Sequence, residues 1–287
     1  MKILDSHIHI FNSQIIENVI SRTELVKRLC LHTEDVYNRL SSTALLNDMA
    51  SAGVSAALML PTSDVGSMVK TNRTCIGLAK GIPELFTAGT LHPDHGNIKE
   101  ELFYLSGAGV RVIKLCSFSQ GFSLDHPKTR DMFERIQDFN NNSRKSFSVV
   151  LDTLTLAHQH FGTDPKNTTT PRGLFRLVSS FPGIDFIGAH MGGLDAPFEE
   201  LSRDLQPLPN LYLDTSNASH TLTTDQFIQM LHTHGPGHIL FGTDWPWFIQ
   251  SNEVELVDIL LEKAGFSTPE KEAVFHGNLE KILGVVI

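Results

Sequence analysis

An alternation of short apolar runs with longer helical patterns constrains this chain more than any other feature of its sequence. The runs are almost entirely apolar, as expected of strands that are buried on both faces. We expect eight strands, at residues 3–10, 54–60, 85–91, 110–116, 147–152, 184–189, 211–214 and 238–241. We expect the helices at residues 42–53, 68–80, 98–105, 132–140, 173–180, 197–205, 225–231, 254–264 and 269–283.

Strands that alternate with helices pair in parallel through right-handed crossovers, so eight such units predict an α/β fold, the closed (β/α)8 TIM barrel. No G-x-G-x-x-G or G-x-x-x-x-G-K-[ST] motif follows an early strand, which removes the usual reason to prefer a nucleotide-binding open sheet. We expect residues 1–287 to form a single barrel domain. Residues 12–40 are a candidate lid above the end of the first strand, and residues 153–171 form a long loop.

Composition narrows the class of partner. Hydrophobic residues make up 41% of the chain and charged residues 19%, which is enough for a sizeable core. The formal net charge of -9 disfavours nucleic acid and anionic membranes, because no basic surplus is available to bind phosphates. We therefore expect a small-molecule substrate, and whether the chain forms a homo-oligomer stays open.

The cysteines and the hydropathy pattern indicate the compartment. Cys30, Cys75 and Cys116 are odd in number and have no C-x-x-C spacing, so neither a disulfide framework nor a cysteine zinc site is expected. No signal-peptide pattern and no membrane-spanning run is found. The expectation is a cytoplasmic protein.

Polar residues close many of the apolar runs. In a barrel of this kind the active site lies at the C-terminal ends of the strands. The residues to collect there are His7, His9, His92, Lys114, Cys116, Asp152, His190, Asp214, Ser216 and Asp244. Imidazole and carboxylate groups are the ligands of zinc, manganese and iron, and a catalytic metal site keeps one position open for water. We expect a divalent metal, zinc first, with manganese or iron as the alternatives.

Four stretches of the chain resemble the amidohydrolase superfamily. They are ILDSHIH at residues 3–9, FIGAHMGG at 186–193, LFGTDWP at 240–246 and HGNLEKIL at 276–283. The chain is most similar to the amidohydrolase-related branch, which contains metal-dependent hydrolases, lactonases and decarboxylases. The resemblance covers nearly the whole chain and implies a TIM barrel of the metal-dependent hydrolase type.

The resemblance also implies roles for individual residues. His7 and His9 bind metal, and Asp244 either binds it or acts as the base toward water. His190 binds a second metal or polarises the substrate. Lys114 stands where relatives similar to phosphotriesterase carry a carbamylated lysine that bridges two metals, although many relatives with one metal leave this lysine unmodified. From the residues alone, Lys114 is also interpretable as a substrate anchor or as a buried lysine paired with Asp152 or Asp214.

One position departs from the family pattern. The fifth strand of the family usually ends in a metal-binding histidine, and this chain has Asp152 there. Aspartate binds the same metals with a shorter reach and an added negative charge. Alternatively, His158 or His160 folds back from the loop. The departure leaves open one metal, two metals or a metal-free lactonase-like site.

The hypothesis that follows is an enzyme, a metal-dependent hydrolase that activates water to cleave a lactone, amide or ester. Asp244 transfers the proton, and His190 or the metal stabilises the oxyanion. Two alternatives remain: a nonoxidative decarboxylase of an aromatic or unsaturated acid, and an inactive barrel that binds a ligand. The sequence carries no motif that identifies the substrate.

Overall fold

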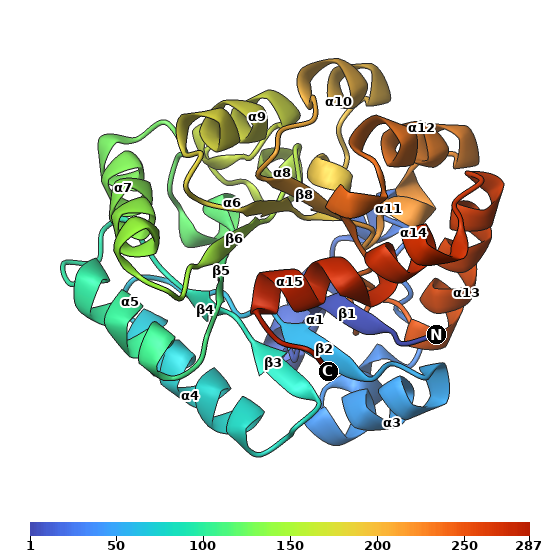
Figure 1. Cartoon of the computed structure of the whole chain (residues 1–287), viewed down its shortest axis with the longest axis horizontal. Coiled ribbons are helices and arrows are strands. Elements are labelled where there is room, and N and C mark those ends of the chain that lie inside the picture. The colour runs from blue at the N-terminus through green and yellow to red at the C-terminus, as the bar shows by residue number, and fades with distance from the viewer.

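The computed structural model describes residues 1–287 and confirms the predicted fold class, a ring of parallel strands surrounded by helices (Figure 1). The strands are β1 (Leu4–Ile8), β2 (Ala56–Met59), β3 (Leu85–Thr87), β4 (Gly89–Thr90), β5 (Val112–Leu115), β6 (Ser148–Leu151), β7 (Phe186–Gly188), β8 (Leu211–Asp214) and β9 (Ile239–Leu240). Only Ala88 separates β3 from β4, so these two share one position and the ring has the eight positions expected.

The strands pair in chain order, from β1 to β3 in one ladder and from β4 to β9 in another. No regular ladder joins β9 to β1. Backbone hydrogen bonds join them instead, from Ser6 N to Phe241 O at 2.8 Å, from His9 N to Trp245 O at 2.7 Å and from Asp244 N to His7 O at 2.9 Å. The first strand is thereby attached to the segment that follows the last one.

The helices are α1 (Ser13–Ile20), α2 (Thr23–Arg28), α3 (Ser42–Ala52), α4 (Met68–Lys80), α5 (Ile98–Gly107), α6 (Ser117–Gln120), α7 (Pro127–Asn142), α8 (Ala157–Phe161), α9 (Pro171–Ser180), α10 (Phe198–Asp204), α11 (Ala218–Thr221), α12 (Thr224–His234), α13 (Gln250–Lys263), α14 (Thr268–Glu272) and α15 (Asn278–Leu283). None of them combines the length and the apolar character needed to cross a membrane. The predicted final helix is interrupted, because a π-helical turn, Ala273–Gly277, separates α14 from α15.

Two apolar layers hold the barrel together. The larger one lies between the strands and the outer helices, and the smaller one fills the barrel interior. Leu279, Ile282 and Leu283 of α15 belong to the interior layer, so this helix closes the end of the barrel that faces the viewer in Figure 1. The interior is therefore a packed core, and only the opposite end is available for a site.

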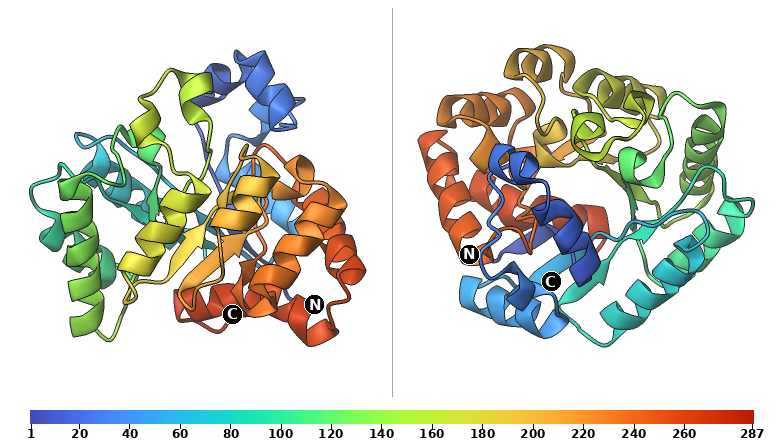
Figure 2. Two further views of the ribbon diagram at one scale, coloured as in Figure 1. Left: turned by 90° about the horizontal axis from the view of Figure 1, so that it is seen from above. Right: turned by 180° about the vertical axis from the view of Figure 1, so that it is seen from behind.

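The candidate lid, residues 12–40, forms α1, α2 and a short 3-10 helix, Val36–Arg39. Figure 2 shows α1 and α2, in dark blue, over the end of the barrel opposite to α15. Ile16, Leu25 and Val36 pack there with Trp247 and Phe248. The loop expected at residues 153–171 is partly helical and contains α8 and the 3-10 helix Pro165–Asn167.

The first strand differs from the expected simple alternation. A regular alternation along β1 would put Leu4 and Ile8 on one face, but Leu4 packs in the barrel interior and Ile8 packs in the outer layer. The pairing register with β2 shifts between Asp5 and Ile8, and such an irregularity turns the following side chains relative to the sheet.

Candidate metal centre

The interior of the barrel becomes polar at the end that the lid covers. Strands β5, β6 and β8 each place an apolar residue in the interior layer, and two positions later each has a charged residue. Because side chains alternate along a strand, these charged residues, Lys114, Asp152 and Asp214, also face inward. Lys114 and Asp214 are almost completely buried.

His7, His9 and Asp244 bring three potential ligand atoms together. His7 Nε2 and His9 Nε2 are 3.1 Å apart, and Asp244 Oδ1 is 3.8 Å from the first and 3.5 Å from the second. A triangle with sides of 3.1, 3.5 and 3.8 Å has a circumradius of about 2.0 Å, and zinc binds nitrogen and oxygen at about 2.0–2.2 Å. One ion therefore fits among these three atoms.

Hydrogen bonds fix the proton positions on both imidazoles. His7 Nδ1 is 2.9 Å from Asp214 Oδ2, and His9 Nδ1 is 3.0 Å from the carbonyl oxygen of Leu60. Since carboxylates and carbonyls only accept hydrogen bonds, each Nδ1 carries the proton and each Nε2 presents a lone pair. The contact of 3.1 Å between the two Nε2 atoms thus joins two acceptors. Such a contact is unfavourable unless a cation lies between the two atoms.

Burial keeps both imidazoles neutral. It lowers the pKa of His7 to about 4, although the adjacent Asp214 opposes the shift. Burial, together with the nearby charges of His7 and Lys114, also lowers the pKa of His9 well below its usual value. Neutral imidazoles are the form that binds metal.

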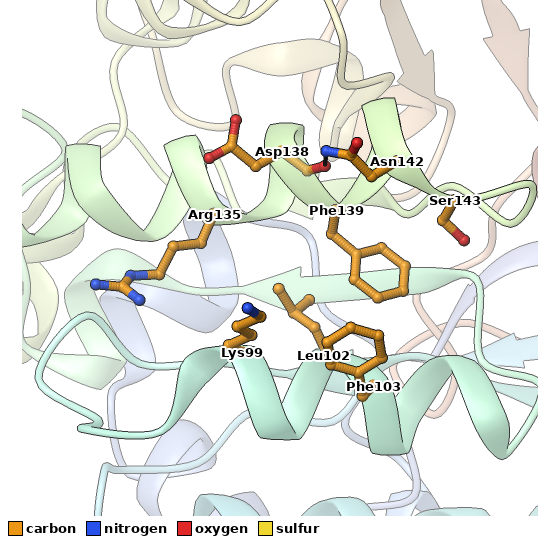
Figure 3. Close-up of a pocket in the computed structure, with 8 residues that line it drawn as sticks. All are labelled: Lys99, Leu102, Phe103, Arg135, Asp138, Phe139, Asn142 and Ser143. Carbon is orange, nitrogen blue, oxygen red and sulfur yellow. Dashed lines mark hydrogen bonds between the residues drawn. The ribbon is translucent and has the colours of Figure 1, made fainter.

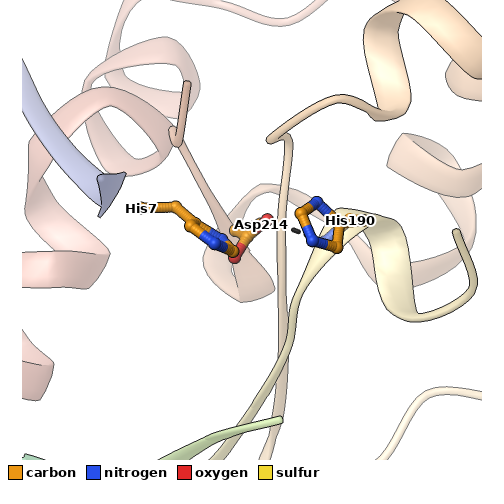
Figure 4. Close-up of side chains that lie close together, drawn as sticks. All are labelled: His7, His190 and Asp214. Carbon is orange, nitrogen blue, oxygen red and sulfur yellow. Dashed lines mark hydrogen bonds and ion pairs between the residues drawn. The ribbon is translucent and has the colours of Figure 1, made fainter. Parts of the chain in front are cut away.

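Asp214 holds His7 and His190 in place through hydrogen bonds. Its carboxylate accepts hydrogen bonds from His7 Nδ1, from the backbone N–H of His190 at 2.8 Å and from the hydroxyl of Ser216. Burial alone raises the pKa of a carboxyl group, but the charge and the hydrogen bond of His7 overcome this effect and hold the pKa of Asp214 well below its usual range. Figure 4 shows His7 and His190 on either side of Asp214.

Asp244 is placed by the backbone rather than by a strand. Its φ of 61° is left-handed, and Gly242, two residues earlier, leaves no space for a side chain: a Cβ there would lie 2.9 Å from Ser6 Oγ and 3.0 Å from His7 Cβ. This close approach brings Asp244 beside β1. Burial raises the pKa of Asp244 to about 7, and the negative charges of Asp152 and Asp214 add to the shift. The carboxyl group can therefore accept and release a proton near neutral pH.

His190, Asp152 and Lys114 form the other side of the site. His190 Nδ1 is 3.0 Å from the carbonyl oxygen of Ser216, and its Nε2 faces Asp152 Oδ2 at 4.0 Å. Lys114 Nζ is 3.8 Å from the same carboxylate oxygen. Burial would raise the pKa of Asp152, but the charges of Lys114 and His190 prevail and lower it. Asp152 does not join the three ligand atoms of His7, His9 and Asp244.

The sequence analysis gave no role to Asp5. Its buried carboxylate accepts four hydrogen bonds: from His7 N at 3.0 Å, from Thr243 N at 3.1 Å, from Thr243 Oγ1 at 2.6 Å and from Gln250 Nε2 at 2.8 Å. It ties β1 to the segment that carries Asp244. A carboxylate within an otherwise apolar run was the available signal, because burial of a charge requires partners.

Other polar residues lie apart from the centre. The ring nitrogens of His92 contact the carbonyl of Gln120 and the backbone N–H of Asp94. His160 is paired with Asp195 at 3.0 Å and does not fold back as a ligand. Asn278 has a structural role, since its amide donates to the carbonyls of Pro236 and Ile239, both at 2.7 Å.

A surface groove of about 680 Å³ lies on the outside of the barrel, between α5 and α7 (Figure 3). Its lining includes Lys99, Phe103, Arg135 and Phe139. The groups of side chains that are able to hold a metal all lie at the barrel mouth instead. The chemistry of the chain is thus concentrated at one end of the barrel.

Comparison with known proteins extends these observations. A family model described as Amidohydrolase matches residues 5–285. No curated protein sequence matches the chain. One similar solved structure is an uncharacterized TIM-barrel protein from Bordetella bronchiseptica, with 19% sequence identity, a TM-score of 0.73 and coverage of 99% of both chains. A second is a 5-carboxyvanillate decarboxylase from Novosphingobium aromaticivorans with bound manganese, with 15% identity, a TM-score of 0.69 and coverage of 99% of this chain and 96% of that one. A third is a probable 2-pyrone-4,6-dicarboxylic acid hydrolase from Acinetobacter baumannii, with 13% identity, a TM-score of 0.63 and coverage of 99% of this chain and 100% of that one.

The structural likeness, at these low identities, establishes the TIM-barrel fold. The family model spans nearly the whole chain, including His7 and His9 at the end of β1 and Asp244 after β9. The chain belongs to the amidohydrolase family.

Proposed function

We propose that this chain is a metal-dependent hydrolase that cleaves a lactone, amide or ester of a small molecule. The observation that carries the proposal is the convergence of two unprotonated imidazole nitrogens, 3.1 Å apart, with the carboxylate of Asp244. His7, His9 and Asp244 hold one divalent ion in this proposal. Zinc suits the mixed nitrogen and oxygen ligands, and the manganese in a similar decarboxylase makes manganese the first alternative.

A bound divalent ion supplies a Lewis acid and lowers the pKa of water toward neutrality. Asp244 removes the proton from the attacking water and later delivers it to the leaving group, as a carboxylate within reach of that water can. Asp214 and Asp5 keep the ligand-bearing segments in place.

His190 acts through its Nε2 atom in this mechanism. Its Nδ1 proton is directed at the Ser216 carbonyl, so Nε2 of the neutral ring is an acceptor. In this proposal it accepts a hydrogen bond from the water or the substrate.

Decarboxylation is the second candidate, because a similar solved structure is a decarboxylase. The charge on Asp152 argues against it. The lowered pKa of Asp152 keeps this carboxylate ionised at neutral pH, and it would repel a substrate carboxylate placed next to it.

A substrate panel tests the proposal. The zinc- and manganese-loaded protein is assayed for hydrolysis of neutral lactones, esters and amides and of 2-pyrone-4,6-dicarboxylate, and for carbon dioxide release from 5-carboxyvanillate. We expect hydrolysis that Asp244→Asn lowers by about 10²–10⁴-fold. Carbon dioxide release without hydrolysis would establish the decarboxylase instead. Metal binding without either reaction on a broad panel would favour the inactive binding barrel.

A further inference from the structure

Lys114 is a buried ammonium group without a hydrogen-bond partner. Its side chain is 1% exposed, and no protein acceptor lies within hydrogen-bond distance of Nζ. The carboxylate of Asp152 is near, but at 3.8 Å it neutralises the charge without accepting a hydrogen bond. A buried ammonium that has none of its three donors satisfied is costly unless an acceptor binds there.

The position of Lys114 in the ring indicates where that acceptor lies. His7 and His9 lie at the end of the first strand position and Asp244 after the eighth. Lys114 lies on β5, the fourth position, and Asp152 directly follows β6, the fifth. In a ring of eight these pairs are opposite one another. Asp152 Oδ2 also lies 4.0 Å from His190 Nε2, and the centre of the His190 ring is 4.8 Å from the centre of the His7 ring. The ammonium therefore faces the centre from across the barrel mouth.

The ion pair also constrains the charge of the acceptor. Lys114 and Asp152 together carry no net charge, so the pair offers directional N–H donors without a surplus of positive charge. An uncharged carbonyl oxygen needs only the donor. A carboxylate at the same place would be attracted less strongly than by an unpaired lysine, because Asp152 repels it.

We propose that Lys114 is a further catalytic residue, which donates a hydrogen bond to the carbonyl oxygen of an uncharged substrate bound between it and the His7–His9–Asp244 centre. This inference rests on the proposed hydrolase function. During attack by water the carbonyl oxygen gains negative charge, so the hydrogen bond strengthens in the transition state and accelerates the reaction. The proton stays bound to Lys114 Nζ throughout the reaction, and Asp152 holds the amine in position.

The first test measures binding of acetamide, an uncharged carbonyl probe, to the zinc-loaded protein by NMR titration. Lys114→Met alone leaves Asp152 buried without its partner, so the double variant Lys114→Met/Asp152→Asn is used to keep the site neutral and folded. We expect this double variant to bind acetamide about tenfold more weakly than the wild type, as expected for loss of one charge-assisted hydrogen bond. Asp152→Asn alone retains the donor and should bind acetamide more tightly than the double variant.

Lys281→Met serves as the matched control, because it removes an amine that bonds Tyr212 at the opposite end of the barrel. It should bind acetamide like the wild type. Equal affinity of the wild type and the double variant would overturn the proposal. So would a carbon-13 carbamate signal on Lys114 after incubation with labelled bicarbonate, since a carbamate has no ammonium donor.

The second test uses a substrate that the wild type hydrolyses. The double variant should lose about 10²–10³-fold in kcat while KM rises by no more than about tenfold, the loss expected for acetamide, because the hydrogen bond matters most in the transition state. A KM effect with unchanged kcat would contradict the catalytic role. If the wild type hydrolyses nothing, the proposed function fails, and the acetamide titration still decides whether Lys114 is a carbonyl donor.

Discussion

Asp214 determines which nitrogen of His7 faces the centre. It accepts the Nδ1 proton and leaves Nε2 bare, and the Leu60 carbonyl does the same for His9. Asp214 and Ser216 could be predicted from the sequence as strand-end residues, since the ends of parallel strands meet at one face. Their hydrogen-bond partners could not be predicted, because these depend on side-chain rotamers and on the irregular register of β1.

Asp214→Asn should weaken zinc binding by about 10–100-fold, because the amide no longer fixes the tautomer and orientation of His7. Competition with a chromophoric chelator measures the affinity. Asp185→Asn is the control, since Asp185 precedes β7 at the other end of the barrel and should bind zinc normally. An Asp214→Asn protein with wild-type affinity would show that Asp214 does not orient a ligand.

Asp152 is the residue where the family pattern and this chain differ, and the structure pairs it with Lys114. Asp152→Leu and Asp152→His should both lower the free energy of unfolding by about 3–5 kcal/mol, because each leaves a buried amine unpaired. Zinc affinity should change by less than about threefold in this account, which leaves Asp152 outside the ligand set. Urea unfolding and zinc titration check both parts. Strong zinc binding by Asp152→His with lost binding by Asp152→Leu would make Asp152 a ligand.

Among the elements, α4 and β8 match their predicted bounds, because each has a clear apolar period and distinct ends. The helices α1 and α2 were not predicted individually. They have eight and six residues, and each buries a single side chain, so neither repeats its apolar face often enough to be detected. The π-helical turn before α15 has no sequence signature.

The end of α12 contains a group that should make stability depend on pH. His234 is buried, and burial, together with the charge of His238, lowers its pKa to about 4. In the unfolded chain the pKa is about 6.5, so between these values the unfolded state binds the extra proton. The contribution of His234 is complete above about pH 6.5 and decreases as the pH falls toward 4, by up to about 3 kcal/mol.

Urea unfolding of the metal-free protein between pH 7 and pH 4.5 measures this dependence. His234→Phe should flatten the decrease in stability relative to the wild type, because it removes one of the groups that must be charged on unfolding. His232→Phe, two residues away and exposed, should leave the slope unchanged. Equal slopes for the wild type and His234→Phe would refute the assignment.

At the scale of the whole molecule, the two ends of the barrel have separate tasks. The interior layer closed by α15 stabilises the fold, and the polar layer under the lid carries the site. The alternation of strands and helices was sufficient to predict this division, because active sites of such barrels lie at the C-terminal ends of the strands. The fold of the lid depends on contacts with Trp247 and Phe248, far along the chain, and could not be predicted.

Leu279→Ala tests the separation of the two ends. Leu279 is 2% exposed and packs in the barrel interior, so the change should cost about 2–5 kcal/mol of unfolding free energy. Zinc affinity of the folded variant should remain within about twofold of the wild type, since the ligands lie at the other end. Calorimetry and zinc titration check the two parts, and a large loss of zinc affinity would mean that the ends are coupled.

The central claim is that His7, His9 and Asp244 form a metal centre, and metal content per chain measures it most directly. Protein purified without chelator is loaded with zinc or manganese, dialysed and analysed by elemental analysis. We predict about one tightly bound ion per wild-type chain, and none in a His7→Ala/His9→Ala double variant whose circular dichroism and melting show that it remains folded. A folded wild-type protein that retains no metal, or a double variant that retains as much as the wild type, would contradict the account.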